Sequence, residues 1–137
     1  MTKARLRNYR NLRKEQEQLR QRLEELETAL YYPKIPRLTD MPKGGSHEGN
    51  AQEDLAIHHI ELQELYTVKL AELEAEQLEI EKAIASLDTI ERLLFRYRYM
   101  DGLKWEEVCV RINYEWSQTH ELHRDALRKL EAMEKSE

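Results

Sequence analysis

The sequence has few of the residues that cross-link a chain or break its helices. Its 137 residues include one cysteine, three prolines and four glycines. A single cysteine excludes a disulfide within the chain and a zinc site built from cysteines alone. Aromatic residues make up only 7%, whereas charged residues make up 36%. This composition predicts extended helices, little sheet and a modest core, in one domain or two small ones.

Long apolar runs are also absent from the sequence. No stretch approaches the length of a membrane span, and the basic N-terminal segment contains no hydrophobic signal core. We therefore expect a cytoplasmic protein that makes no contact with membranes.

Charge is distributed unevenly along the chain, whose net charge is −5. Residues 1–22 contain eight basic and two acidic side chains, whereas residues 51–87 contain nine acidic and two basic ones. Residues 88–137 are nearly neutral, with nine basic and eleven acidic side chains. The acidic total argues against indiscriminate binding of nucleic acids, but the basic first segment could meet anionic partners.

Residues 1–30 are interpreted as a basic N-terminal helix that begins at about Lys3. An apolar stripe recurs at spacings of four and three residues, the rhythm of a coiled coil. It consists of Leu12, Gln16, Leu19, Leu23, Leu26 and Leu30. Packing within the chain is weighed against a role as an oligomerisation or DNA-contacting arm. The side chains that could touch phosphates are Arg5, Arg7, Arg10, Arg13 and Lys14, with a solvated cationic face as the alternative.

Residues 31–51 are predicted to be a linker, because three prolines forbid a continuing helix and three glycines loosen the chain. Residues 52–87 are predicted to form a second, acidic heptad helix. Its stripe consists of Leu62, Tyr66, Leu70, Leu73, Gln77, Ile80, Ile84 and Leu87. This helix should pair antiparallel with the first helix or with its copy in another subunit, because a lone helix leaves its stripe in water. Cross-chain pairing is favoured, which predicts a homo-oligomer, most simply a dimer.

Residues 88–137 are predicted to form three helices separated by two short breaks. Asp88 can cap the first helix, and Gly102 can end it. The second helix runs from about Lys104 to Arg111, and Asn113 makes a tight turn because it tolerates positive φ. The third helix is expected to bury Thr119, Leu122, Ala126, Leu127 and Leu130. The predicted fold class is all-α: a long, coiled-coil-like helical hairpin followed by a C-terminal three-helix helix-turn-helix module.

In such a module the third helix enters the major groove and presents its first turns to base edges. The residues predicted to do so are Trp116, Ser117, Gln118, His120, Glu121 and Arg124. Gln118 suits adenine, Arg124 suits guanine or phosphate, and Glu121 can accept from cytosine. Lys104 and Trp105 are expected to hold the phosphate backbone. For each of them an ordinary solvated residue is the alternative, and the near-neutral charge of the module is the main evidence against DNA binding.

The run YRYMDGLKWEEVCVRINY resembles the promoter-reading fourth region of bacterial sigma factors. With the later LHRDAL it is more similar to the RinA/ArpU-like family of phage and prophage late-transcription activators, over about residues 40–130. Glu115 stands where the pattern usually has serine, and Cys109 where it has alanine. The resemblance implies a sequence-specific regulator that activates phage or prophage late genes, binds promoter DNA at the nucleoid and has RNA polymerase as a further candidate partner. A small terminase subunit that binds packaging-site DNA and a coiled-coil interaction scaffold that binds no DNA are the alternatives.

Few residues suggest catalysis or metal binding. His58 and His59 are adjacent and face apart on a helix. His120 and His123 share a face, but no cysteine or carboxylate motif accompanies them. Cys109 is expected to be buried and inert. We predict that the chain is not an enzyme and has no metal and no cofactor.

Overall fold

The computed structural model describes residues 1–32 and 46–136, with residues 46–50 described by their backbone alone. Most of the predicted linker, including Pro33, Pro36, Pro42, Gly44 and Gly45, lies outside the described residues. Among the described helices, none combines the length and the apolar character needed to cross a membrane.

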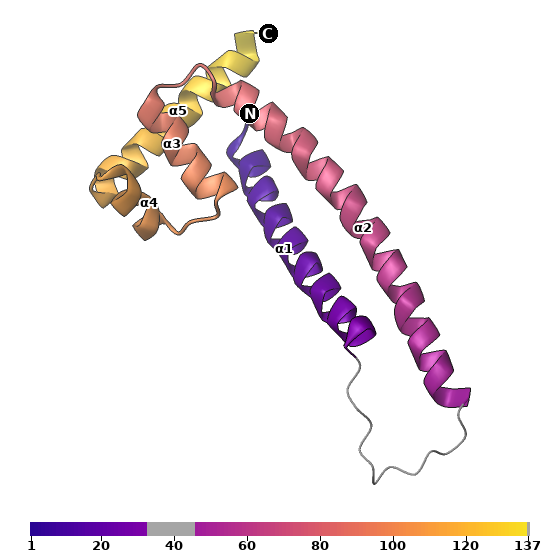
Figure 1. The fold of residues 1–137 in the computed structure, drawn as a ribbon. Coiled ribbons are helices and arrows are strands. Elements are labelled where there is room, and N and C mark those ends of the chain that lie inside the picture. Colours follow the sequence, from indigo (N-terminus) through magenta and orange to yellow (C-terminus); the bar gives the residue numbers. More distant parts are fainter. Residues whose placement is uncertain (33–45, 137) are drawn as a thin grey trace. The chain divides into compact units, whose positions relative to one another are not determined.

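The described residues form a long helical hairpin followed by shorter helices, which confirms the predicted all-α fold class (Figure 1). The elements are α1 (Lys3–Tyr31), α2 (Ser46–Ile84), α3 (Thr89–Phe95), the π-helical turn η1 (Arg96–Met100), α4 (Trp105–Ile112) and α5 (Trp116–Ser136).

Both ends of α2 differ from the prediction. The helix begins at Ser46 rather than at residue 52, so the last residues of the predicted linker are helical. No proline follows Pro42, and Gly49 costs a helix only about 1 kcal/mol relative to alanine. The helix ends at Ile84 rather than Leu87, because the Leu87 N–H closes a tight turn onto the Ile84 carbonyl at 3.0 Å.

The chain divides into two compact units, Met1–Glu15 with Ala71–Glu137, and Gln16–Leu70. In the second unit the hairpin buries Leu23 and Leu26 of the predicted α1 stripe. His59 Nε2 lies 3.2 Å from Glu27 Oε1, and the Gln52 amide donates to the Leu30 carbonyl at 3.4 Å. Among the alternatives for α2, these contacts identify pairing with α1 of the same chain.

The first unit has one core to which α1, α2 and the C-terminal helices all contribute. Leu6 and Tyr9 of α1 are fully buried, and Leu73, Ile80 and Ile84 of α2 lie in the same cluster. The C-terminal helices add Leu94, Phe95, Tyr99, Val108, Ile112, Ala126 and Leu130. Leu73 and Ile80 were candidates for cross-chain pairing, but they are covered within the chain because the C-terminal helices and the first turns of α1 supply the core that two heptad helices lack.

The start of α3 fixes that helix to α5. Asp88 is the N-cap residue, as predicted, and its backbone N–H donates to Glu91 Oε1 at 3.1 Å. Only 2% of Glu91 is exposed, and its carboxylate also accepts from Lys129 Nζ at 2.9 Å. The bond to Lys129 raises the pKa of that amine. A buried carboxylate is costly unless it is paired, so Glu91 links the cap of α3 to one side of α5.

Candidate nucleic-acid interface

The turn between α4 and α5 has the backbone that the sequence predicted. Asn113 lies in the left-handed region at φ 59°, and the Tyr114 N–H donates to the Cys109 carbonyl at 3.1 Å. Gly102, at φ 71°, makes the earlier break. The short helix α4 and the longer α5 therefore meet at a tight turn and both pack on α3, which is the arrangement of a helix-turn-helix. Cys109 is half-buried rather than buried, because its side of α4 is only partly covered.

The start of α5 is held by two side chains that lie one helical turn from Glu115. The Gln118 side chain accepts from the Glu115 N–H at 3.3 Å, and the buried Thr119 hydroxyl donates to the Glu115 carbonyl at 2.9 Å. Further along, Ala126 and Leu130 are buried, whereas Leu122 and Leu127 are half-buried. One face of α5 is thus anchored in the core and the opposite face remains in water.

The predicted readers of α5 fall into two groups. Trp116, Ser117, Gln118, Glu121 and Arg124 are exposed and lie together on the first turns of the helix. His120 is half-buried instead, with its ring 4.4 Å from that of Trp116 and 4.6 Å from that of Trp105. The five exposed side chains can contact a ligand directly, whereas the His120 ring packs against the Trp116 ring.

Trp105 and Lys104, the two predicted backbone contacts of α4, also differ in their environment. Lys104 is the exposed N-cap residue of the helix. Trp105 is half-buried against His120 and His123, and the Arg98 guanidinium lies 4.6 Å from its ring centroid. Lys104 is therefore accessible to an anion, whereas Trp105 packs within the module.

His123 is the buried centre of this aromatic cluster. Its Nε2 lies 2.6 Å from the Tyr99 hydroxyl, and the Phe95 ring lies 5.6 Å away. Burial raises the pKa of Tyr99 to about 12. Burial, assisted by nearby Lys3, lowers the pKa of His123 to about 4. At neutral pH the hydroxyl therefore donates to an uncharged imidazole, which fits a structural role for His123.

This arrangement predicts that folding depends on the protonation of His123. Between pH 6.5 and about 4 the unfolded chain binds more protons at this residue than the folded chain. Its contribution is complete above pH 6.5 and is lost as the pH falls through about 4. The shift corresponds to roughly 3 kcal/mol. In urea unfolding across this range, His123→Phe should flatten the fall in stability, while His58→Gln, at an exposed histidine, should keep the slope of the unmodified chain. An equal slope in His123→Phe would contradict the assignment.

The predicted cations of α1 have distinct partners. Arg5 forms a two-pronged ion pair with Glu76, with Nε 2.5 Å and Nη2 3.0 Å from its carboxylate oxygens. Arg10 donates at 3.2 Å to the carbonyls of Arg98 and Gly102. Arg13 donates to the Tyr9 hydroxyl at 3.2 Å. Arg5 and Arg10 therefore tie α1 to other segments of the first unit, whereas the Arg13 bond stays within α1.

Arg7 and Lys14 complete the predicted basic set of α1. Both are exposed, and neither makes a hydrogen bond or ion pair with any described residue. Sequence reasoning missed Lys3 and Arg98, which line the same cavity as Arg7. The spacing of Lys3, Arg7 and Arg10 could have indicated one cationic face. Arg98 gave no such signal, because its place depends on how η1 packs against α1.

No cluster of three or more histidine, cysteine, aspartate or glutamate residues within residues 1–32 and 46–136 could hold a metal ion. No protein-family model, curated protein or solved structure matches the chain.

Proposed function

We propose that the chain is a sequence-specific regulator that binds double-stranded DNA with the first turns of α5 in the major groove. The observation that carries the proposal is the left-handed turn at Asn113, which joins α4 to a helix whose anchored face leaves Trp116, Gln118 and Arg124 exposed. In helix-turn-helix proteins the same turns of the second helix meet base edges. Activation of phage or prophage late genes, with RNA polymerase as a partner, is proposed on the sequence resemblance alone.

Charge at the interface is consistent with this role only if cations outside α5 take part. Glu115 and Glu121 are exposed at the start of α5 and would repel phosphates. Exposed Lys104, Arg7 and Lys14 make no ion pair with a described residue. They can therefore neutralise phosphates while Glu121 accepts from a cytosine amino group.

Recovery of bound fragments from phage and host DNA tests the proposal and its alternatives together. Promoter fragments are the expected result. Packaging-site fragments would identify a small terminase subunit, and no fragments at all would favour an interaction scaffold that does not bind DNA.

Single substitutions should distinguish a residue that reads DNA bases from one that contacts the DNA backbone. Gln118→Ala is expected to cost roughly 1–3 kcal/mol on the preferred site and to relax its preference at one position. Lys104→Ala should weaken preferred and unrelated sites together, as loss of a phosphate contact does. Fluorescence anisotropy with both DNA sequences measures each effect.

Gln118 also caps α5, so a matched variant is needed. Gln118→Glu keeps an oxygen that can accept from the Glu115 N–H, but it loses the amide donor that adenine requires. It should lose the preference while its urea midpoint stays unchanged. If Gln118→Ala and Lys104→Ala both leave binding untouched, α5 is not the reader and the scaffold becomes the better proposal.

A homo-oligomer, most simply a dimer, remains a prediction, and the surface that would form it has changed. Exposed apolar side chains of α2 in the second unit, rather than Leu73 and Ile80, are now the candidates for contact with a second copy. They are Ile57, Ile60, Leu65 and Val68. Light scattering of the unmodified chain separates a dimer from a ring, and a monomer at micromolar concentration would end this part of the proposal.

A further inference from the structure

The first unit contains a cavity with a cationic lining, to which α5 contributes. Side chains from α1, η1, α4 and α5 enclose a cavity of about 250 Å³. We call it the basic pocket, and it is lined by Lys3, Arg7, Arg10, Asn11, Arg98, Tyr99, Trp105, His120 and His123. Four of these residues are cations and none is a carboxylate, although the whole chain has an excess of acidic residues.

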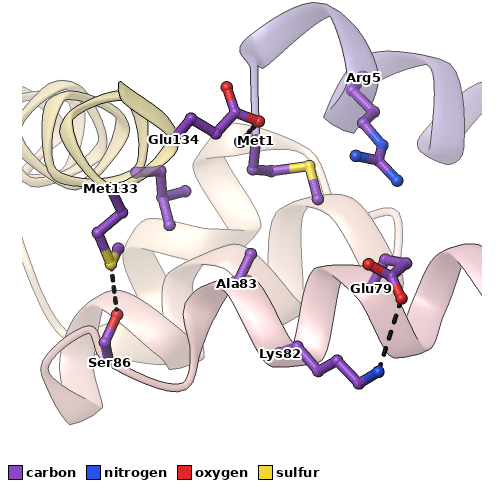
Figure 2. A pocket seen from close by; sticks show the side chains of 9 residues that line it. Met1, Arg5, Glu79, Lys82, Ala83, Ser86, Met133 and Glu134 are labelled. Atoms are coloured by element: carbon purple, nitrogen blue, oxygen red, sulfur yellow. Dashed lines mark hydrogen bonds and ion pairs between the residues drawn. The ribbon is translucent and has the colours of Figure 1, made fainter. Parts of the chain in front are cut away.

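Two cations of the basic pocket have no partner among the described residues, unlike the cations that line a larger cavity of the same unit. The larger cavity, whose lining side chains are drawn in Figure 2, has a volume of about 470 Å³. There the Met1 amine pairs with Glu134, and Lys82 Nζ lies 3.7 Å from Glu79 Oε1. In the basic pocket, Lys3 and Arg7 make no hydrogen bond or ion pair with a described residue. The cations of the larger cavity are therefore paired with carboxylates. In the basic pocket Arg10 and Arg98 donate only to backbone carbonyls, and Lys3 and Arg7 have no such partner.

Two further groups make the basic pocket suited to an anion. His120 Nε2 is buried without a hydrogen-bond partner among the described residues. Leaving such a nitrogen unpaired costs free energy, and a hydrogen bond to an oxygen atom bound in the pocket would remove that cost. Burial and the positive charges of Arg10 and Arg7 lower the pKa of Arg98, while Tyr99 and Glu106 oppose part of that shift. A bound anion would remove the repulsion among these side chains.

We infer that the basic pocket binds a phosphoryl group, held by Lys3, Arg7 and Arg10 with His120 Nε2–H as a further donor. A planar carboxylate presents two oxygens in one plane, which suits a single guanidinium. A tetrahedral phosphate presents oxygens in several directions and can be reached from α1 and α5 at once. The pocket is smaller than the clefts that enclose drug-sized ligands, so it fits one or two phosphoryl groups rather than a whole nucleotide.

The phosphoryl group has two sources, free phosphate or the DNA backbone, and the experiment distinguishes them. Inorganic phosphate and pyrophosphate are titrated into the full chain by calorimetry, and the His120 imidazole is followed by nitrogen NMR. Saturable binding with a shift of the His120 Nε2 resonance is expected. Malonate, a planar dianion, should bind more weakly, and equal affinity for malonate would overturn the phosphoryl assignment.

Variants connect the binding to the pocket. Arg7→Gln removes an exposed cation without a structural partner and should weaken pyrophosphate binding roughly tenfold, the loss expected for one charged hydrogen bond. Arg128→Gln removes a cation elsewhere in the same unit and should change nothing. His120→Phe keeps a ring between Trp105 and Trp116 but loses the nitrogen, so binding should weaken without a fall in melting temperature.

The second part of the experiment tests the DNA backbone as the source of the phosphoryl group, with the same variants and a DNA duplex. If a backbone phosphate occupies the pocket, pyrophosphate competes with DNA and Arg7→Gln lowers the salt slope by about one unit, while Arg128→Gln leaves it intact. If the pocket takes free phosphate, pyrophosphate binds without displacing DNA. The inference does not depend on the proposed function, because the free-phosphate arm needs no DNA. It is overturned if neither probe binds saturably and Arg7→Gln and Arg128→Gln behave alike on DNA.

Discussion

Replacement of Ile80 by aspartate is expected to unfold the first unit rather than to dissociate an assembly. Ile80 is 1% exposed and packs in one cluster with Leu6 and Tyr9 of the same chain. The substitution removes a buried aliphatic side chain and places a carboxylate in its position without a partner. Each effect costs several kcal/mol, roughly 2–5 for the lost side chain alone. The sum approaches the 5–15 kcal/mol that stabilises a typical domain.

Leu78→Asp is the matched control, since Leu78 lies on the same helix and is 55% exposed. This variant should change stability by no more than about 0.5 kcal/mol, as surface substitutions usually do. Urea unfolding followed by circular dichroism measures both variants, and light scattering measures their mass. If Ile80→Asp stayed folded with a reduced mass, Ile80 would lie between copies of the chain, as the heptad pattern alone suggested.

The helices were predictable because their signals are local. A heptad stripe predicted each long helix, and single residues such as Asp88, Gly102 and Asn113 predicted the breaks between the short ones. Each of these residues acts through its own backbone or its immediate neighbours. The two ends of α2 were exceptions. Nearby prolines and glycines suggested that the helix begins at residue 52, whereas it begins at Ser46, and the heptad stripe suggested an end at Leu87, whereas it ends at Ile84.

The packing partners were not predictable in the same way. Periodicity identifies the apolar face of a helix but not the surface that covers it. The predicted stripe of α1 begins at Leu12, yet Leu6 and Tyr9 are buried deeper than Leu12 because the C-terminal helices cover them. The basic arm inferred from the sequence is therefore also a part of the core.

The candidate interface was predictable to the extent that it lies on one helix. Which side chains of α5 are exposed follows from the position of its first turn and its helical spacing. The contact of the Trp105 ring with the His120 ring, and the presence of Lys3, Arg7 and Arg98 in one cavity, depend on contacts between distant segments. No pattern within a single segment contains that information.

The last prediction concerns Tyr9 of α1, a helix that contributes both buried residues to the core and exposed cations to the basic arm. Tyr9 is fully buried, and its hydroxyl donates to the Gln77 side chain at 3.4 Å and accepts from Arg13 at 3.2 Å. Tyr9→Ala should cost about 3–5 kcal/mol, as truncation of a buried aromatic ring does, because the surrounding helices cannot collapse fully into the space. Asn8→Ala, at the exposed neighbour, should change little.

Tyr9→Phe separates the ring from its hydroxyl, and it should cost only about 0.5–1.5 kcal/mol in urea unfolding. A large loss in Tyr9→Ala would also decide how the basic arm is to be tested on DNA. Deletion of residues 1–14 would remove Leu6 and Tyr9 from the core, so weaker binding after deletion would reflect unfolding as much as lost charge. Neutral replacements at exposed Arg7 and Lys14 leave the core intact and isolate the electrostatic contribution. An unchanged midpoint in Tyr9→Ala would instead mean that the first turns of α1 are a free arm, and deletion would then be the better experiment.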